Sequence, residues 1–403
     1  MTKPAQPTGP LAPQARLIGI DAARGFAILG VLIANIITFG LPYHQFADAA
    51  FFSEGADRMA VQSVRFLVEG KFYALLSLLF GLGFGMVRLR TRQQERPFYG
   101  PTFRRLAWLL LAGLLHFLLL SEIDVLASYA LLAMVLVPLF AGRRPATVLI
   151  AACLFLPLLV AAYLVIWRLA DPADPIVAGR SGEAISTAFT QFQEQHHRIY
   201  TGDYSHLFSH RLQKMAVSVL GSFFAAILFV LPPFLLGLYL GLKGFFNNPE
   251  IHAGPLRRLF RVSLAVGLLF SWVDMSLRAS SQVMLFSPNT LIWMVSFFIG
   301  CPAMGLAYLS GVVRLAHNSQ AFWLKPLAAV GRLSLSNYVL QSLIASLLFH
   351  GYGLGLYDRM GPATSLLLVP VIFAINVAFS LAWTRRYKFG PLEGLWRRLS
   401  YGS

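Results

Sequence analysis

The sequence predicts an all-α protein, a polytopic transmembrane helical bundle of about ten spans with its N and C termini in the cytoplasm. Hydrophobic residues make up 57% of the 403 residues and charged residues only 12%, whereas a soluble domain carries roughly 25% charged residues. Apolar runs recur from residue 26 to residue 384 without a long polar block between them. A single membrane domain is therefore predicted, and several soluble domains are excluded.

Each predicted span follows from the thickness of the bilayer. A helix needs about 20 apolar residues to cross a hydrocarbon core near 30 Å thick, because every backbone polar group there must be satisfied within the segment. About ten runs meet this requirement, although polar residues interrupt the ninth. The predicted spans are 21–41, 71–89, 103–121, 124–141, 146–168, 216–242, 259–279, 288–313, 328–350 and 363–384.

These runs divide the chain into four parts. Residues 1–15 are predicted to be a disordered cytoplasmic tail, and 16–168 an N-terminal membrane half with spans one to five and the expected active site. Residues 169–215 are an extracytoplasmic cap or loop, and 216–403 a C-terminal membrane half with a basic cytoplasmic tail. No cleavage site follows the first run, so it is expected to be retained as a helix.

The net charge of +16 comes from short basic clusters in alternate connections, as the positive-inside rule requires. The predicted partner is therefore the lipid bilayer, and nucleic acid is excluded. No metal site is predicted either, because both cysteines, Cys153 and Cys301, fall inside apolar runs. The histidine-rich stretch of the cap matches no compact ligand motif and suits a solvated helix better.

Ionisable groups inside a bilayer are functional candidates, because they cost free energy unless they face a polar cavity or a partner. Asp21 and Arg24 are three residues apart and share a helix face, to which Asn35 returns after nearly four turns. A simple ion pair that pins the cytoplasmic end of the first span would explain Asp21 and Arg24 equally well. It does not explain Asn35.

The third span contains His116 within an apolar run, and Asp124 follows eight residues later at the start of the fourth. Imidazole titrates near neutral pH and can act as a general base, and a carboxylate could orient it or raise its basicity. The alternative is a buried neutral histidine bonded to a carbonyl group. The spacing alone does not prove that the two side chains touch.

Two further groups of polar residues lie in or beside spans. Lys71 and Tyr73 begin the second span, where they line a substrate site or act as an interfacial anchor with a snorkelling lysine. Arg332, Asn337 and Gln341 interrupt the ninth span, where they bind substrate or join neighbouring helices. The glycines of the Gly-Leu-Gly-Phe-Gly run at 81–85 indicate close helix packing, not a nucleotide loop.

Together these motifs closely resemble the bacterial YeiB-like membrane proteins, a family of unknown function, over nearly the whole chain. The resemblance rests on Asp21-Ala-Ala-Arg24-Gly25 with Asn35, Glu69-Gly-Lys71-Phe with Leu79-Phe80-Gly81, His116 with Asp124, Gly331-Arg332-Leu-Ser-Leu-Ser-Asn337-Tyr338-Val-Leu-Gln341, and Phe389-Gly390-Pro391-Leu-Glu393-Gly-Leu-Trp396-Arg397. It implies a multi-pass protein of the bacterial inner membrane.

YeiB-like proteins are in turn distantly similar to transmembrane acyltransferases such as heparan-α-glucosaminide N-acetyltransferase. That similarity implies acyl-CoA or acetyl-CoA as a donor substrate, no bound cofactor, and a glycan or lipid acceptor. It maps a catalytic histidine near His44, so His116 and His44 are alternative bases, with Asp124 and Asn35 completing the catalytic group. Arg104 and Arg105 would hold CoA phosphates, although the positive-inside rule alone explains these arginines.

A membrane transporter of a small solute or lipid is the competing interpretation. Intramembrane Asp, Arg, His and Asn residues also line substrate and proton pathways. The span pattern contains no clear inverted repeat, which weakens that interpretation. A purely structural membrane protein is a third one, and the helix-packing motifs allow a homodimer.

Overall fold

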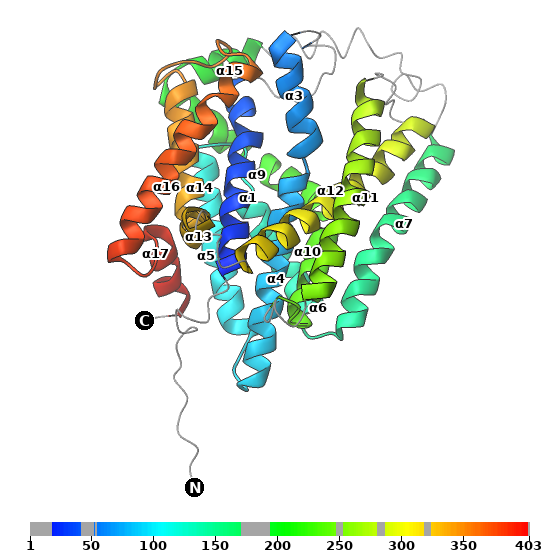
Figure 1. Cartoon of the computed structure of the whole chain (residues 1–403). Helices are drawn as coiled ribbons and strands as arrows, with labels where there is room; N and C mark the ends of the chain where they lie inside the picture. Colours follow the sequence, from blue (N-terminus) through cyan, green and yellow to red (C-terminus); the bar gives the residue numbers. More distant parts are fainter. Residues whose placement is uncertain are drawn as a thin grey trace.

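The computed structural model describes residues 18–41, 52, 55–170, 194–246, 253–279, 287–317 and 324–401. Within these ranges every regular element is a helix (Figure 1), which confirms the predicted fold class. The helices are α1 (Ile18–Gly40), α3 (Gly55–Leu67), α4 (Lys71–Gln93), α5 (Tyr99–Leu119), α6 (Leu126–Phe140), α7 (Pro145–Leu169), α9 (Tyr204–Phe229), α10 (Leu231–Leu242), α11 (Ala253–Ala279), α12 (Pro288–His317), α13 (Leu324–Arg332), α14 (Ser334–Phe349), α15 (Pro362–Leu366), α16 (Leu368–Arg386) and α17 (Pro391–Tyr401). Residues 194–201 form a further short helix.

The chain is a multi-pass membrane protein. Among the described residues, eight helical stretches are long and apolar enough to cross a bilayer, and three shorter apolar helices, α6, α10 and α14, pack among them. The span within α7 buries none of its residues against the rest of the protein. Its leucines therefore face lipid, as a peripheral membrane helix requires.

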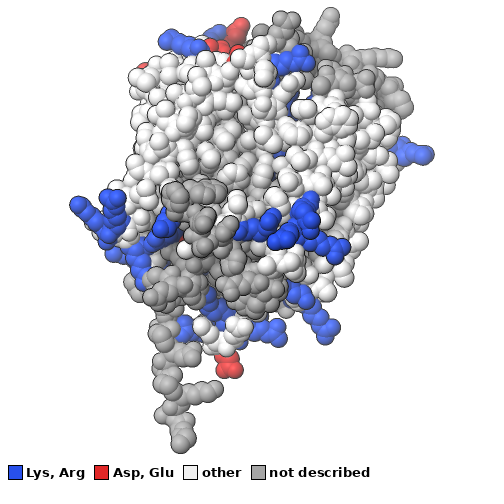
Figure 2. Space-filling view, viewed as in Figure 1, with Lys and Arg blue, Asp and Glu red and all other residues white. Residues whose placement is uncertain are grey.

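The charges orient the bundle in the membrane. Most Lys and Arg side chains gather at the end of the molecule near α17 and the start of α1 (Figure 2), and a wide uncharged band separates them from the opposite end. By the positive-inside rule this basic end is cytoplasmic. The opposite, outer end carries the α5–α6 turn and the helix of residues 194–201.

The sixth predicted span, 216–242, is wrong in both its start and its continuity. Helix α9 already begins at Tyr204 and ends at Phe229, and α10 follows as a separate helix. Pro232 and Pro233 explain the break, because a proline inside a helix removes a backbone hydrogen bond and clashes with the preceding turn. About three turns that were assigned to the cap therefore belong to the bundle.

The ninth predicted span, 328–350, is also broken. Helices α13 and α14 meet at Leu333, whose φ of −111° and ψ of 36° are not helical. The Asn337 side chain donates to the carbonyl oxygens of Val330 (3.2 Å) and Leu333 (3.0 Å), in addition to the backbone N–H groups that these two carbonyl groups accept at the break. A broken helix within a membrane requires such internal partners.

Glycines bring α4 and α10 into close contact, which confirms the packing role expected for the 81–85 run. A side chain on Gly81 would collide with the Phe234 carbonyl group, and one on Gly237 with that of Leu78. Small residues four apart on both helices allow the backbones to approach in this way.

Helices from the two predicted membrane halves interleave. Helix α1 packs against α4 and also against α12, α13 and α14. At the cytoplasmic end, Gly25 of α1 lies against the Leu327 carbonyl group of α13, and Gly331 lies against that of Asp21. Residues from both halves consequently surround the polar groups that line α1, α4 and α5.

Candidate functional site

His116 and Asp124 meet inside the bundle. The His116 Nδ1 lies 3.0 Å from an Asp124 carboxylate oxygen, Oδ1, and only 1% and 3% of their side chains are exposed. The two atoms are close, but the contact does not have the geometry of a hydrogen bond. The other ring nitrogen, Nε2, is buried and has no hydrogen-bond partner in the part of the chain that the structure describes.

The turn between α5 and α6 creates this contact. Asp124 precedes α6, and its Oδ2 accepts the Ala127 N–H at 2.7 Å, so the carboxylate stabilises the start of that helix. Gly113 lies one turn before His116 on the same face of α5, and a side chain there would collide with Ala127. The missing side chain lets the first turn of α6 approach α5 and brings Asp124 beside the imidazole.

Tyr338 of α14 covers the other side of the imidazole. The two ring centroids are 4.8 Å apart with an interplanar angle of 33°. The Tyr338 hydroxyl donates to the Ile123 carbonyl oxygen at 3.1 Å, which fixes α14 to the α5–α6 turn. The orientation of His116 is therefore set by three helices.

Asn35 belongs to a neighbouring chain of hydrogen bonds. Its Oδ1 accepts from the Tyr73 hydroxyl at 3.4 Å. Ser77, one turn further along α4, lies 2.8 Å from the Tyr129 hydroxyl, which donates to the Tyr73 carbonyl oxygen at 2.9 Å. These hydrogen bonds link α1, α4 and α6. They use the Asn35 side-chain oxygen and leave its amide N–H groups as the available donors.

Tyr338 lies between the two polar groups. Its hydroxyl interacts electrostatically with Asp124 and also with Tyr73 and Tyr129. Tyr338 therefore connects the His116–Asp124 pair, which its ring contacts, with the Asn35–Tyr73 hydrogen bond, which lies within electrostatic range of its hydroxyl.

The predicted cytoplasmic residues form a separate region. The Arg24 Nη1 donates to an Asp21 carboxylate oxygen at 3.1 Å, as their spacing predicted. Arg105 stacks on the Trp396 ring at 4.7 Å, and Arg104 is exposed. Eleven residues separate Arg24 from Asn35 on α1, a distance of about 16 Å along the helix axis.

Lys71 is not a snorkelling residue. Only 1% of it is exposed, and its Nζ donates to the Arg65 carbonyl oxygen at 2.6 Å. Nearby, Arg278 of α11 lies 3.4 Å from the Glu69 carboxylate and 3.2 Å from that of Asp274. Lys71 therefore ties α4 to the end of α3.

The three predicted residues of the broken span have different surroundings. Asn337 donates to the Ser380 hydroxyl of α16 at 2.8 Å, and Gln341 accepts from Asn376 of α16 at 3.4 Å. These contacts support the alternative that both residues join helices. Arg332 keeps its Nε buried and without a hydrogen-bond partner among the described residues. A substrate role for these three remains a prediction.

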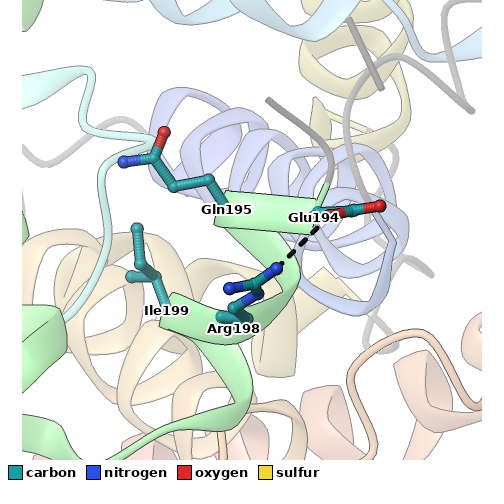
Figure 3. A pocket seen from close by; sticks show the side chains of 4 residues that line it. All are labelled: Glu194, Gln195, Arg198 and Ile199. Carbon is teal, nitrogen blue, oxygen red and sulfur yellow. Dashed lines mark hydrogen bonds and ion pairs between the residues drawn. The ribbon is translucent and has the colours of Figure 1, made fainter. Parts of the chain in front are cut away.

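Two other features are separate from this site. His44, the alternative base, lies outside the described residues. An open hollow of about 380 Å³ lies on the helix of residues 194–201, where Arg198 and Glu194 form an exposed ion pair at 3.3 Å (Figure 3). None of its four lining residues belongs to the intramembrane polar groups.

Sequence reasoning missed a second polar layer, which lies just outside His116. Arg211 of α9 is fully buried and donates to the Leu120 carbonyl oxygen at 2.9 Å. Burial, with a smaller contribution from Glu122, raises the pKa of Tyr200 well above its usual value. Burial and the Arg211 charge lower the pKa of His350 to about 3, so this imidazole is neutral at physiological pH. The misplaced start of the sixth span hid Arg211 in the predicted cap.

Comparison with known proteins places the chain among bacterial relatives. It is 30% identical to the uncharacterized protein YxaH of Bacillus subtilis, over 95% of this chain and 93% of the relative. It is 26% identical to the uncharacterized protein YeiB of Escherichia coli, over 96% of each chain. No solved structure matches the chain. Residues 240–403 match the family described as Protein of unknown function (DUF418), and the chain belongs to this YeiB-like family of unknown function.

Proposed function

We propose that this protein is an acyltransferase of the bacterial inner membrane that moves an acyl group from cytoplasmic acyl-CoA to a glycan, lipid or small-molecule acceptor. The observation that carries the proposal is the buried His116–Asp124 pair with its unpartnered Nε2. A nitrogen buried in this way lacks the hydrogen bond that buried polar atoms normally have. An acceptor hydroxyl is a suitable partner for it.

The arrangement fits general-base catalysis. Asp124 stabilises a proton on His116 Nδ1, and Nε2 is then free to take the proton of an acceptor hydroxyl. The hydroxyl oxygen attacks the thioester carbonyl carbon, the carbon–sulfur bond breaks, and the CoA thiolate leaves and takes up the proton from the imidazolium. The Asn35 amide is the donor that we assign to the developing oxyanion.

The two ends of the bundle suit the two substrates. The cytoplasmic arginines, Arg24, Arg104 and Arg105, offer charge to CoA phosphates, although Arg24 and Arg105 already have protein partners. The His116 side chain lies about 17 Å further along α5 than Arg105. The pantetheine arm of the donor would span this distance through the bundle, and the acceptor would enter from the outer side.

The test measures CoA thiol release by the purified protein in lipid nanodiscs. Acetyl-CoA and a longer acyl-CoA are supplied with either a membrane lipid extract or a mixture of oligosaccharides. We expect acceptor-dependent CoA release and, without acceptor, a higher unfolding temperature in the presence of acyl-CoA. If neither effect occurs with any donor, the acyltransferase proposal fails and transport becomes the better explanation.

Asn35→Ala distinguishes a catalytic amide from a binding amide. Loss of an oxyanion donor lowers turnover by roughly a hundredfold and changes donor affinity little. The control is Asn289→Ala, on the first turn of α12, which should leave turnover unchanged. Equal losses of turnover and donor affinity in Asn35→Ala would show that the amide contacts the bound donor in the ground state.

A further inference from the structure

Arg211 is a buried cation that forms no ion pair with a carboxylate among the described residues. Its side chain is fully buried, and the Leu120 carbonyl oxygen is the partner of Nη2. Nε and Nη1 have no hydrogen-bond partner in the described ranges, and no carboxylate there lies within ion-pair distance of the guanidinium. Taking a charge out of water without a paired anion is strongly unfavourable. A bound anion would remove that cost.

One carboxylate, that of Glu122, belongs to the same layer and is engaged by two other members of it. Glu122 lies 3.8 Å from the His210 Nε2 and interacts with the Tyr200 hydroxyl. Arg211 acts electrostatically on His210, Tyr200 and His350. Arg211 therefore shares this layer with two imidazoles and a phenol, which can donate hydrogen bonds to an oxyanion, and with the charged side chains of Glu122 and Lys214.

The layer adjoins the candidate active site. The Leu120 N–H donates to the His116 carbonyl oxygen at 2.9 Å, and the Leu120 carbonyl oxygen accepts from Arg211. The guanidinium therefore contacts the end of α5 about one helical turn, roughly 6 Å along the axis, outside His116. A ligand of a few bonds can reach both residues.

An alternative explanation is that Arg211 only caps α5. A cation at a helix C-terminus is favourable and can bond to the last carbonyl groups. That role uses one guanidinium nitrogen and leaves the other two buried and unpaired. A forked guanidinium with free nitrogens is suited to bidentate recognition of a carboxylate or phosphate.

We propose that Arg211 binds the carboxylate or phosphate group of an acceptor that enters from the outer side and presents its hydroxyl to His116. The acceptor role rests on the proposed function, whereas anion binding does not. Two kinds of molecule carry such an anionic group: a soluble molecule, such as a sugar phosphate, and a lipid with a phosphate in its headgroup. Both would place their anion beside the α5–α6 turn.

The experiment measures the unfolding temperature of the purified full chain in a neutral detergent. One arm titrates glycerol 1-phosphate or inorganic phosphate, and the other adds phosphatidylglycerol, with phosphatidylcholine as the uncharged reference. We expect saturable stabilisation in one arm, which identifies the soluble or the lipid source. Stabilisation in neither arm overturns the proposal, whatever the variants show.

Arg211→Gln and Arg211→Lys identify the residue responsible. We expect the anion dissociation constant to rise about tenfold to a hundredfold in Arg211→Gln, with a smaller rise in Arg211→Lys, which keeps the charge without the fork. Arg198→Gln is the matched control, because Arg198 is an exposed arginine at the same end. If Arg211→Gln does not fold, Arg211→Lys serves alone, and unchanged affinity in it overturns the proposal.

His116→Gln separates this inference from the proposed function. This variant should bind the anion as the wild type does while it loses CoA release. Loss of CoA release in Arg211→Lys with a raised acceptor KM supports the acceptor role. Anion binding in a protein that never releases CoA would support the site and refute only the acyltransferase.

Discussion

Two buried polar regions on α5 and α14 differ in how completely their atoms are paired. At the α13–α14 break, the Glu393 carboxylate of α17 accepts from the Ser336 N–H at 3.0 Å and from the Ser336 hydroxyl at 2.6 Å. Asn337 there makes three hydrogen bonds and leaves only its Oδ1 unpaired. These contacts of Ser336 and Asn337 join α14 to α13, α16 and α17.

The α5–α6 turn shows the opposite pattern. Buried atoms without hydrogen-bond partners among the described residues gather there, on His116, Glu122, Asp124, His210 and Arg211. A folded protein rarely keeps such atoms unless water, an ion or a substrate completes them. Residues in both regions are buried, so burial does not distinguish them. The difference is whether their polar atoms have hydrogen-bond partners: paired atoms join helices, and unpaired atoms are available to a ligand.

The largest expected effect comes from His116→Gln. Removal of a general base lowers turnover by about a hundredfold to ten-thousandfold. The unfolding temperature should remain close to that of the wild type, because His116 makes no directed hydrogen bond whose loss would be felt. CoA release and thermal unfolding are measured together, with the exposed His206→Gln as control. Full turnover in His116→Gln would assign His116 to the fold.

Asn337→Ala tests the hydrogen bonds at the α13–α14 break. The substitution leaves the Val330 and Leu333 carbonyl groups and the Ser380 hydroxyl buried without this donor, which costs about 3 kcal/mol of unfolding free energy. Turnover per folded molecule should be unchanged. Denaturant titration in mixed micelles measures the loss, and a large fall in turnover with intact stability would support the substrate role first predicted for this residue.

The low pKa of His350 predicts a pH dependence of stability. Its pKa is about 3 in the folded protein, below the usual 6.5, so the unfolded chain binds the extra proton. Stability is therefore lost as the pH falls below about 6.5, by about 2 kcal/mol at pH 5. Unfolding at several pH values should show a flatter profile in His350→Gln, while His206→Gln keeps the wild-type slope.

The smallest effect is expected for Glu393→Gln. The amide oxygen can still accept the Ser336 N–H, but the amide nitrogen cannot accept from the Ser336 hydroxyl, and the negative charge that favours the start of α14 is lost, so stability falls by about 1 kcal/mol. CoA release per folded molecule should not change. Glu194→Gln, which removes an exposed carboxylate, is the control. A fall in turnover without loss of stability would connect α17 to the reaction.

The sequence alone determined the membrane class, most of the spans and the residues of the His116–Asp124 pair. Span prediction succeeds because each membrane helix must satisfy its own backbone and present an apolar surface, which are local properties. The Asp21–Arg24 pair was predictable for the same reason, since helical spacing alone puts the two side chains together.

Tertiary structure alone decided the break of the ninth span and the contacts between helices. The ninth span could not be drawn correctly from hydropathy, because Asn337 and Glu393 stabilise its interruption from other turns and another helix. The break of the sixth span is different, because Pro232 and Pro233 mark it in the sequence itself. The contact of His116 with Asp124 depends on the approach of α6 to Gly113. Arg211 had no signal in the sequence, because the sequence does not tell whether an arginine is buried or solvated. Only the packing of the helices shows which of its nitrogens lack a hydrogen-bond partner.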